Sequence, residues 1–417
     1  MYSILDNYRA VFSGQWWHRE RIRRLQESKL ARLVRHAYAS VPYYRNLFDT
    51  AGVSPAAIRT LDDLQRVPLT TKRILNQHDP EDLISSHFKR TQLEHDSSSG
   101  SSGTPFSVYL DRRYVLNRNM RFLRGLFAAG YRPGDRLLLI TDRHGGHGKS
   151  WMRWEKASPE EPPDRLLQRI EALRPAVLYG SGTPLRQLAE LMQHTGYCAA
   201  FLKAVIWTAE TLDAQTRRLL ERAFTTEVFD FYGLTEMGLV AWECPAHAGY
   251  HVSDDSVLVE YLPLRDSAGA YRMVMTNLNL YSMPLIRYDT GDLGIRQPAA
   301  DCQCGRGLSR LERVEGRVVD MIKLSNGETF SPYSFICRLE TLQGLQRFHI
   351  LQDTSDHITV CFQSAPGERA RLDQDIRRIV TGIVGERLDV TVTGLDTLDA
   401  DGNGKFRAVR SLVERPT

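Results

Sequence analysis

The feature that most constrains the fold is a regular alternation of short apolar runs and longer amphipathic segments between residues 137 and 231. The apolar runs, which have the length of buried strands, cover residues 137–140, 176–179, 204–207 and 227–231. Helical periodicity fills the gaps over residues 166–173, 184–192 and 211–223. Buried parallel strands are joined by crossover helices, so this alternation predicts an α/β fold with a doubly wound, mostly parallel sheet.

The pattern changes on both sides of this region. Helical spacing over residues 20–38 precedes it, and residues 256–261 and 271–276 predict strands joined by turns, which indicates a β subdomain at about 250–315. Beyond it, helices at 334–342 and 367–384 alternate with strands at 348–351, 357–362 and 388–393. We therefore expect a large domain over residues 1–317 and a small α+β domain over residues 318–417.

Composition excludes several classes of protein. The 417 residues include 54 basic and 50 acidic side chains without a long basic run, so we expect no nucleic-acid partner. The sequence contains neither a signal-peptide pattern nor an apolar stretch of about 18 residues, so we expect no membrane partner and a cytoplasmic location. Six cysteines are too few for a disulfide framework in a chain of this length.

A serine- and glycine-rich run is the first segment that could bind a ligand. It comprises Ser98, Ser99, Gly100, Ser101, Ser102, Gly103 and Thr104. Small residues let backbone N–H groups close around phosphate oxygens, and hydroxyl groups add further donors. The lysine-containing loop of the common nucleoside triphosphatases is absent. A flexible linker remains the alternative interpretation of this run.

A second segment, 230–238, follows a predicted strand directly, where doubly wound proteins bind ligands. Its Tyr232 could stack on a base, Thr235 could reach a phosphate and Glu236 could hold Mg²⁺ through carboxylate oxygens. Gly233 lies between them. A strand end followed by an ordinary polar turn is the alternative.

Three further residues have a similar chemical character. Asp292 follows a glycine, so its carboxylate could accept hydrogen bonds from ribose hydroxyl groups, although Asp is also a common turn residue. Arg317 places a cation next to the expected domain boundary. Lys405 lies in a glycine-rich loop near the end of the sequence, where an exposed lysine is usually only solvated.

One group of residues has the character of metal ligands. Cys302 and Cys304 form a Cys-x-Cys pair, and Cys244 precedes two candidate histidines, His247 and His251. Three thiolates and an imidazole would complete a tetrahedral Zn²⁺ site of the structural kind. Unligated thiols in a reducing compartment are the alternative.

The order of these segments resembles the acyl-adenylate-forming superfamily of acyl-CoA synthetases, luciferases and peptide-synthetase adenylation domains. Within it, the chain is most similar to the phenylacetate-CoA ligase-like branch. Four further segments look like that branch, at residues 33–44, 68–72, 132–135 and 208–211. The likeness covers nearly the whole chain, and His251 lies in a Gly-x-His segment typical of the branch, which favours it over His247.

The resemblance implies ATP-dependent activation of a carboxylic acid, aryl or related, as an acyl-adenylate, and then transfer to a thiol, with coenzyme A as the expected acceptor. It implies that residues 98–104 bind the pyrophosphate end of ATP and that Tyr232 packs on adenine. Thr235 would contact phosphate, and Glu236 would help to hold Mg²⁺. Asp292 and Arg317 would hold the ribose. Lys405 would bridge the acid and the α-phosphate, where a cation offsets the repulsion of two anions.

Family members also rotate the small domain between the two steps, which implies a mobile C-terminal domain with a hinge near Val319. The chain departs from the family at Val319, where the usual acidic or lysine pivot is missing, and at Thr104, which replaces a loop lysine. Three alternatives stay open. The acceptor could be an amine or the thiol of an acyl-carrier protein, or the chain could be a catalytically weak homologue that binds nucleotide or acid. The acid and the oligomeric state stay undetermined.

Overall fold

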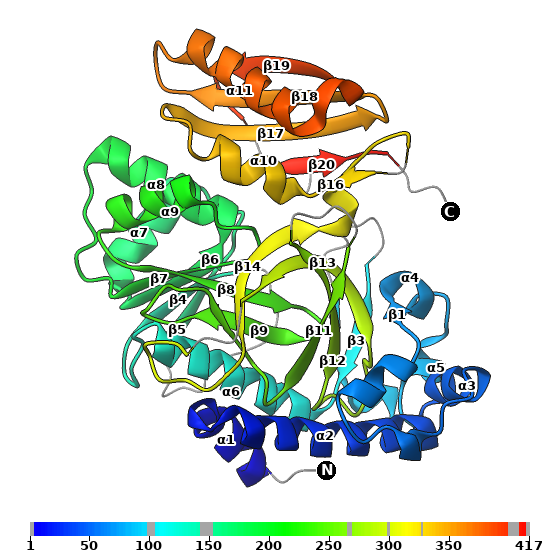
Figure 1. Cartoon of the computed structure of the whole chain (residues 1–417). Helices are drawn as coiled ribbons and strands as arrows, with labels where there is room; N and C mark the ends of the chain where they lie inside the picture. Colours follow the sequence, from blue (N-terminus) through cyan, green and yellow to red (C-terminus); the bar gives the residue numbers. More distant parts are fainter. Residues whose placement is uncertain are drawn as a thin grey trace.

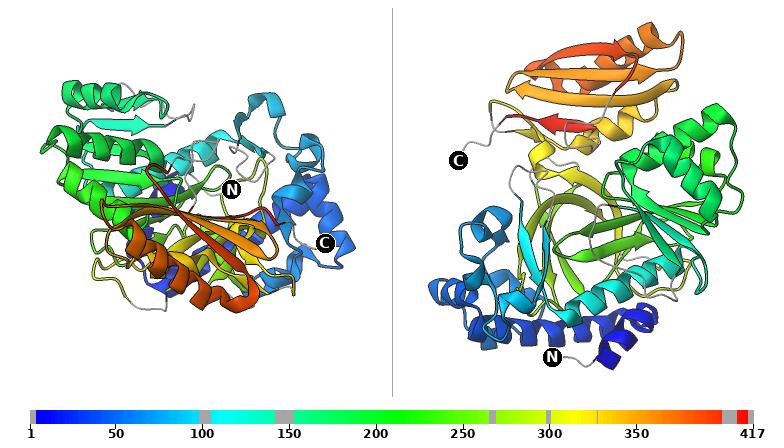
Figure 2. Two further views of the ribbon diagram at one scale, coloured as in Figure 1. Left: turned by 90° about the horizontal axis from the view of Figure 1, so that it is seen from above. Right: turned by 180° about the vertical axis from the view of Figure 1, so that it is seen from behind.

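The computed structural model describes residues 4–97, 105–141, 153–264, 269–297, 301–326, 328–398 and 408–413. A large body is built around one sheet, and a smaller C-terminal unit lies over one end of it (Figure 1; Figure 2). Among the described residues, no helix has the length and apolar character needed to cross a membrane.

The central sheet has 12 strands: five in a parallel half, six in an antiparallel half, and β1 (Thr70–Thr71), which pairs in parallel with a strand of the second half. Its parallel half contains β4 (Leu137–Ile140), β5 (Trp154–Ala157), β6 (Val177–Ser181), β7 (Ala204–Thr208) and β8 (Val228–Leu234). Its antiparallel half contains β9 (Gly238–Glu243), β10 (Tyr250–Val252), β11 (Val257–Pro263), β12 (Tyr271–Asn277), β13 (Tyr288–Arg296) and β14 (Arg310–Arg317). The predicted parallel strands are confirmed. The strands expected in a β subdomain continue the same hydrogen-bonded sheet through β9 and β10.

Helices cover both faces of the parallel half, as in a doubly wound fold. On one face lie α7 (Pro163–Leu173), α8 (Gly182–Thr195) and α9 (Ala214–Phe224), whose leucines pack on alternate strand residues such as Leu138 and Leu178. The opposite face, which includes Leu137 and Leu139, packs against α6 (Arg112–Ala128). The sequence periodicity did not predict helix α6. This helix begins where Asp111 accepts hydrogen bonds from the backbone N–H groups of residues 113 and 114.

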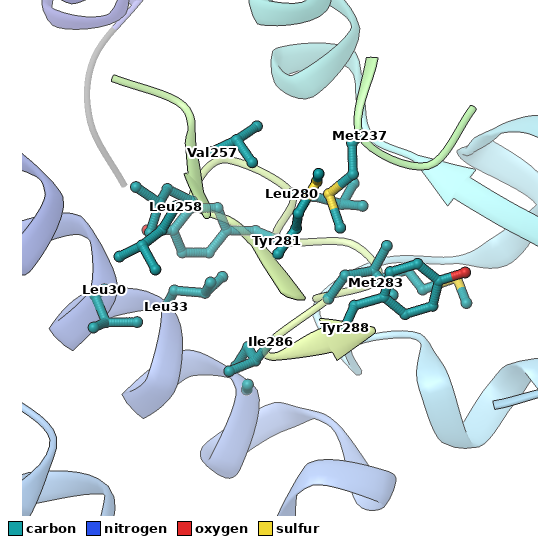
Figure 3. Packing of buried hydrophobic residues seen from close by; sticks show 14 of the residues in the cluster. Leu30, Leu33, Met237, Val257, Leu258, Leu280, Tyr281, Met283, Ile286 and Tyr288 are labelled. Atoms are coloured by element: carbon teal, nitrogen blue, oxygen red, sulfur yellow. The ribbon is translucent and has the colours of Figure 1, made fainter. Parts of the chain in front are cut away.

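The N-terminal segments pack against the antiparallel half. They are α1 (Ile4–Phe12), α2 (Arg19–Ser40), α3 (Pro42–Thr50), β1 (Thr70–Thr71), α4 (Lys72–Leu75), α5 (Pro80–Leu83), β2 (Glu94–Ser97) and β3 (Ser107–Leu110). Leu30 and Leu33 of α2 face Leu258 and Ile286 in the largest apolar core (Figure 3). Short 3₁₀ helices occur at Gly14–Trp16, Pro55–Ala57, Asp62–Arg66, Arg90–Gln92, Val318–Asp320 and Gly385–Arg387.

A group of buried charges joins the N-terminal helices to the sheet. Arg124 of α6 lies 2.6 Å from the Asp255 carboxylate and donates to the carbonyl of Val11 in α1. Lys29 of α2 donates to the Asp255 carbonyl at 2.7 Å and to Asn279 at 2.9 Å. Burial lowers the pKa of Lys29 to about 8, although Asp255 raises it. Buried charges are expensive unless they are paired, so these contacts fix the position of three helices.

The C-terminal unit has a sheet and an apolar core of its own. Its elements are β15 (Ile322–Lys323), β16 (Thr329–Phe330), α10 (Pro332–Leu339), β17 (Leu345–Thr354), β18 (His357–Ser364), α11 (Arg369–Val384), β19 (Asp389–Leu395) and β20 (Val409–Ser411). The four-stranded sheet has the order β19-β18-β17-β20. Its core is made by α10, α11 and the inner faces of these strands. The predicted helices and strands of this region are confirmed to within a few residues, and the boundary at residues 317 and 318 stays a prediction.

We expect that Asp255→Asn lowers the free energy of unfolding by about 3–5 kcal/mol, because it leaves Arg124 and Lys29 buried without their carboxylate. Denaturant unfolding followed by circular dichroism measures this. The control is Glu20→Gln, which removes an exposed ion pair with Arg24 and should cost less than about 1 kcal/mol. Equal effects of the two variants would contradict the prediction.

Candidate active site and metal centre

Three residues from the sequence analysis meet where β8, β13 and β14 come together. Asp292 and Arg317 are direct partners in the β13–β14 pairing. The Tyr232 hydroxyl donates to Asp292 Oδ2 at 2.6 Å, and Arg317 Nε lies 3.3 Å from Asp292 Oδ1. The sheet therefore brings together side chains that are 25 to 85 positions apart in the sequence.

The Asp292 carboxylate is held tightly. It is only 4% exposed, and the preceding Gly291 has φ +74°, a conformation that suits glycine. Burial raises the pKa of the Asp292 carboxyl, while Arg317 and the Tyr232 hydroxyl lower it. A carboxylate fixed by one cation and one hydroxyl group is a preorganised acceptor for hydrogen bonds from a ligand.

Glu236 lies in the turn between β8 and β9, beside this group. It is 7% exposed, and Tyr288 donates to its Oε1 at 2.9 Å. Burial raises the pKa of the Glu236 carboxyl, although Tyr288 and the more distant Lys72 lower it. Gly233, near the end of β8, has no room for a side chain, because a Cβ atom there would lie 2.8 Å from the carbonyl oxygen of Gly238. Thr235 is half-buried in this turn.

Lys72 is a candidate that the sequence analysis did not single out as a site residue. It follows β1, which pairs in parallel with β13, so that Thr71 lies opposite Asp289. Its ammonium group interacts electrostatically with both Glu236 and Arg317. Burial lowers the pKa of Lys72, Glu236 raises it and Arg317 lowers it. The only sequence signal was the likeness of residues 68–72 to the branch, since pairing across more than 200 residues leaves no local pattern.

Several predicted site residues lie outside the described residues. They are Ser98, Ser99, Gly100, Ser101, Ser102, Gly103, Thr104 and Lys405. The strands that flank residues 98–104 are described: Ser97 of β2 pairs with Ser107 of β3. Phe106 stacks on Tyr288, with ring centroids 6.0 Å apart. Phe106, which follows this segment, therefore lies next to the tyrosine that donates to Glu236.

The predicted metal ligands form one cluster. The ligand atoms of Cys244, His251, Cys302 and Cys304 all lie within 4.8 Å of one another. The sulfur atoms of Cys244 and Cys302 are 3.7 Å apart, and Cys304 Sγ lies 3.2 Å from His251 Nε2. Tetrahedral Zn²⁺ with Zn–S bonds of about 2.3 Å places two sulfur ligands about 3.8 Å apart, so the donor set and its spacing fit zinc.

The geometry favours His251 over His247 as the fourth ligand. His247 Nδ1 lies 3.4 Å from Glu243 Oε2, and His247 is not part of the cluster. His251 instead directs Nε2 at Cys304 Sγ, within the cluster. His251 pairs with Arg310 in the sheet, seven residues before Arg317 in β14, which is about 23 Å along a strand. The cluster is therefore remote from Asp292 and suits a structural ion.

The cysteine loop also holds the N-terminal segment. Arg306 Nε donates to Gln15 Oε1 at 2.8 Å, and the Gly307 N–H donates to the Gln15 carbonyl at 2.9 Å. The Arg306 guanidinium lies 4.7 Å from the centre of the Trp16 ring. An ion bound by Cys302 and Cys304 would stabilise this contact between the two ends of the large body.

No family model matches the chain. A search of known proteins finds the phenylacetate-coenzyme A ligase of Thermus thermophilus, 32% identical over 323 residues that cover 73% of this chain and 72% of that protein. The phenylacetate-coenzyme A ligase of Escherichia coli is 29% identical over 331 residues, with coverage of 75% and 74%.

Among solved structures, a 2-hydroxyisobutyryl-CoA ligase has the same fold. In its postadenylation state it matches with a TM-score of 0.80 at 20% identity, over 96% of this chain and 91% of that chain. The same ligase in its thioesterification state, with an acyl-AMP and CoA, gives a TM-score of 0.66 over 95% and 91%. ATP-bound MatB from Rhodopseudomonas palustris gives 0.54 at 17% identity, over 77% and 68%.

The structural likeness confirms the predicted α/β fold of acyl-CoA synthetase type. The sequence identity with the Thermus thermophilus ligase extends over more than two thirds of both proteins. From the residues at the strand ends, the fold and this identity together, we conclude that the chain belongs to the phenylacetate-coenzyme A ligase family.

Proposed function

We propose that this chain activates an aryl or related carboxylic acid at the site formed by Tyr232, Glu236, Asp292 and Arg317. As a member of this family, it is an AMP-forming acid–thiol ligase, which makes an acyl-adenylate with ATP and then a CoA thioester. The observation that supports the proposed site best is the Tyr232–Asp292–Arg317 contact at the carboxyl end of β8. Open α/β sheets bind nucleotides in such places.

We assign the ribose to Asp292, whose oxygens can accept hydrogen bonds from sugar hydroxyl groups while Arg317 neutralises its charge. Tyr232 is then placed to pack on adenine, and Thr235 to contact a phosphate. Glu236 is the carboxylate that would hold Mg²⁺, because Tyr288 occupies Oε1 and thereby orients the group. When bound, the ion would supply positive charge next to the phosphates.

The adenylation step joins two anions, a carboxylate and a phosphate. A carboxylate oxygen attacks the α-phosphorus, the bond to the bridging oxygen of pyrophosphate breaks, and pyrophosphate leaves with the negative charge. Cations that face both groups stabilise the transition state most, because charge is concentrated there. We assign this role to Lys405, and the binding of the pyrophosphate end to residues 98–104.

The acceptor that best fits is the CoA thiol, which attacks the acyl carbonyl and displaces AMP. Transfer to an amine or to an acyl-carrier protein remains the second candidate, and assays of thioester formation with each acceptor in turn separate the two. The thiol must reach the carbonyl after pyrophosphate has left, which a hinge near Val319 would allow.

The test of the function is ATP–pyrophosphate exchange with a panel of aryl and alkyl acids. We expect at least one acid to support exchange, and Lys405→Ala to slow adenylation about 10²–10³-fold through loss of charge stabilisation. Asp356→Asn, an exposed substitution in the β17–β18 turn, serves as the control and should not change the rate. If no acid supports exchange, the chain is the catalytically weak homologue instead. A fully active Lys405→Ala would reject the role assigned to Lys405.

Lys72 provides a second prediction. Thr104 stands where the family has a loop lysine, and Lys72 places a cation near Glu236 from a different segment. We expect Lys72→Met to raise the KM for ATP and to lower kcat/KM about tenfold or more, as for the loss of a charged contact worth about 1.5–3 kcal/mol. Lys72→Arg, which keeps the charge, should recover part of the loss. Steady-state kinetics with varied ATP measures this, and an unchanged KM would contradict it.

We also propose that Cys244, His251, Cys302 and Cys304 hold a structural Zn²⁺. Purified protein should contain about one zinc ion per chain by elemental analysis, since four protein ligands complete the site. Cys304→Ser should lose most of the metal and melt at a lower temperature, because metal binding stabilises the folded state. Cys198→Ser is the matched control, since Cys198 is exposed and outside the cluster. Full zinc content in Cys304→Ser would refute the site.

A further inference from the structure

The contact between the C-terminal unit and the large body contains two carboxyl groups for which nearby cations offset only part of the cost of burial. Glu340 follows α10, and its carbonyl accepts a hydrogen bond from Gln215 of α9 at 3.4 Å. Its half-buried carboxylate accepts the backbone N–H of Ala214, the first residue of α9. Glu340 therefore approaches the N-terminus of a helix in the large body, where N–H groups lack partners within the helix.

That helix end already has an acidic residue. Asp213 caps α9 with hydrogen bonds to Thr216 N at 2.7 Å and Thr216 Oγ1 at 2.6 Å. The charged groups that face Glu340 are Asp213 and Arg218 from the α9 segment and Arg313 from β14. Burial raises the pKa of Glu340 to about 7, Asp213 raises it further, and the Ala214 N–H and the two arginines lower it.

Glu315 of β14 lies on the same boundary. It is 3% exposed, and Ser331, just before α10, donates to its Oε2 at 3.3 Å. Burial raises the pKa of Glu315 to about 7, with a further increase from Glu312, while Arg313 and Ser331 lower it. Arg313 Nε lies 3.4 Å from Glu315 Oε1, and the Arg313 side chain is itself partly exposed.

A third contact on this boundary places charges of both signs together. Arg347 of β17 faces Arg186 of α8, as well as Glu190, Glu210 and Asp213. Burial and Arg186 lower the pKa of Arg347 to about 10, although Glu190, Glu210 and Asp213 act in the opposite direction. Docking of the C-terminal unit therefore buries groups of both signs with partial compensation, which makes the contact marginal and sensitive to charge.

The docked arrangement is one of several that this fold adopts. The same 2-hydroxyisobutyryl-CoA ligase matches this chain with TM-scores of 0.80 in its postadenylation state, 0.68 in an open conformation and 0.66 in its thioesterification state. The identity is 20% in each case, and each comparison covers 91% of that ligase. The C-terminal unit of this chain thus lies in an arrangement closer to the postadenylation state.

We propose that Glu340 and Glu315 are positioning residues that hold the C-terminal unit in this arrangement when they are protonated and release it when they ionise. The proposal rests on the two-step ligation proposed above, in which the arrangement must change between adenylation and thiol attack. Proton loss from these two groups then favours the arrangement needed for thiol attack, and proton uptake favours the return to the docked arrangement.

The direction of the pH effect follows from the two states of each carboxyl group. In the docked unit the pKa of each is about 7, and in an undocked unit exposed to water it returns towards 4.5. The two carboxyl groups therefore take up protons when the C-terminal unit docks. Their protonation favours docking fully below about pH 4.5, and this contribution weakens as the pH rises towards 7. Above about pH 7 both states are ionised and the dependence levels off.

The experiment measures the distance between spin labels on the large body and on the C-terminal unit of the full chain, without substrates. One label is attached to exposed Cys198, and the other to Arg378→Cys in α11, with Cys361→Ser to remove a half-buried thiol. The ratio of docked to undocked chains should fall with rising pH by up to about tenfold per pH unit for each carboxyl group. Glu340→Gln and Glu315→Gln should each reduce this slope, and the double variant should show none.

Asp213→Asn provides a second test if a glutamine variant folds poorly. It keeps the cap on α9 but removes the negative charge beside Glu340, so the midpoint of the pH response should move to lower pH. In the ligation assay at about pH 8, Glu340→Gln should lower the ratio of thioester formation to pyrophosphate exchange several-fold, because the docked state is no longer weakened by ionisation.

Two results would overturn the proposal: a wild-type distance distribution that does not change between about pH 5 and pH 7.5, or an unchanged slope in the double variant. Both differ from a failure of the proposed function, which shows itself as absent ATP–pyrophosphate exchange. Since the labels report the arrangement without substrate, a pH-dependent distance in an inactive chain would support the role of Glu340 and Glu315 and reject only the ligation.

Discussion

The β13–β14 pairing, which sets Asp292 opposite Arg317, is the constraint on which the site depends. Asp292 alone would be a buried carboxylate with a large desolvation cost. Arg317 across the ladder and the Tyr232 hydroxyl from β8 compensate for that cost, and each is delivered by a different strand. A slip of one residue in this register would turn Arg317 to the other face of the sheet and leave the charge without its partner.

The same pairing links the two halves of the molecule. The parallel half ends at β8, and the antiparallel half continues through β9 and β10 to β14, after which the chain enters the C-terminal unit. The site therefore lies where the direction of the strands changes and next to the residues on which the C-terminal unit docks. Glu315 is only two residues before Arg317 in β14, so the docking contact and the proposed nucleotide site share one strand.

Rigid and marginal contacts are divided clearly between these regions. The Arg124–Asp255–Lys29 group is fully buried and hydrogen-bonded, and it ties helices α1, α2 and α6 to the antiparallel half. The loop that follows the proposed zinc ligands Cys302 and Cys304 holds the N-terminal segment through Arg306 and Gly307. The boundary with the C-terminal unit instead places Glu340 beside Asp213, and Arg347 near both Arg186 and three acidic side chains. The proposed movement of the C-terminal unit between the two chemical steps requires an interface of this weaker kind.

The sequence by itself determined the features that local pattern encodes. Strand and helix periodicity predicted the parallel half of the sheet and most elements of the C-terminal unit to within a few residues, because side-chain burial repeats over neighbouring positions. It did not single out α6, whose buried face includes Arg121 and Arg124 and so breaks the apolar pattern. The order of the segments also indicated the family.

Only the tertiary structure decided the relations between distant residues. The pairing of β1 with β13 brings Lys72 close to Glu236, the fold of β10 selects His251 and leaves His247 beside Glu243, and docking of α10 places Glu340 at the start of α9. Each depends on strand register and packing across tens to hundreds of residues. Those interactions are set by the free energy of the whole core, so no local stretch of sequence contains them.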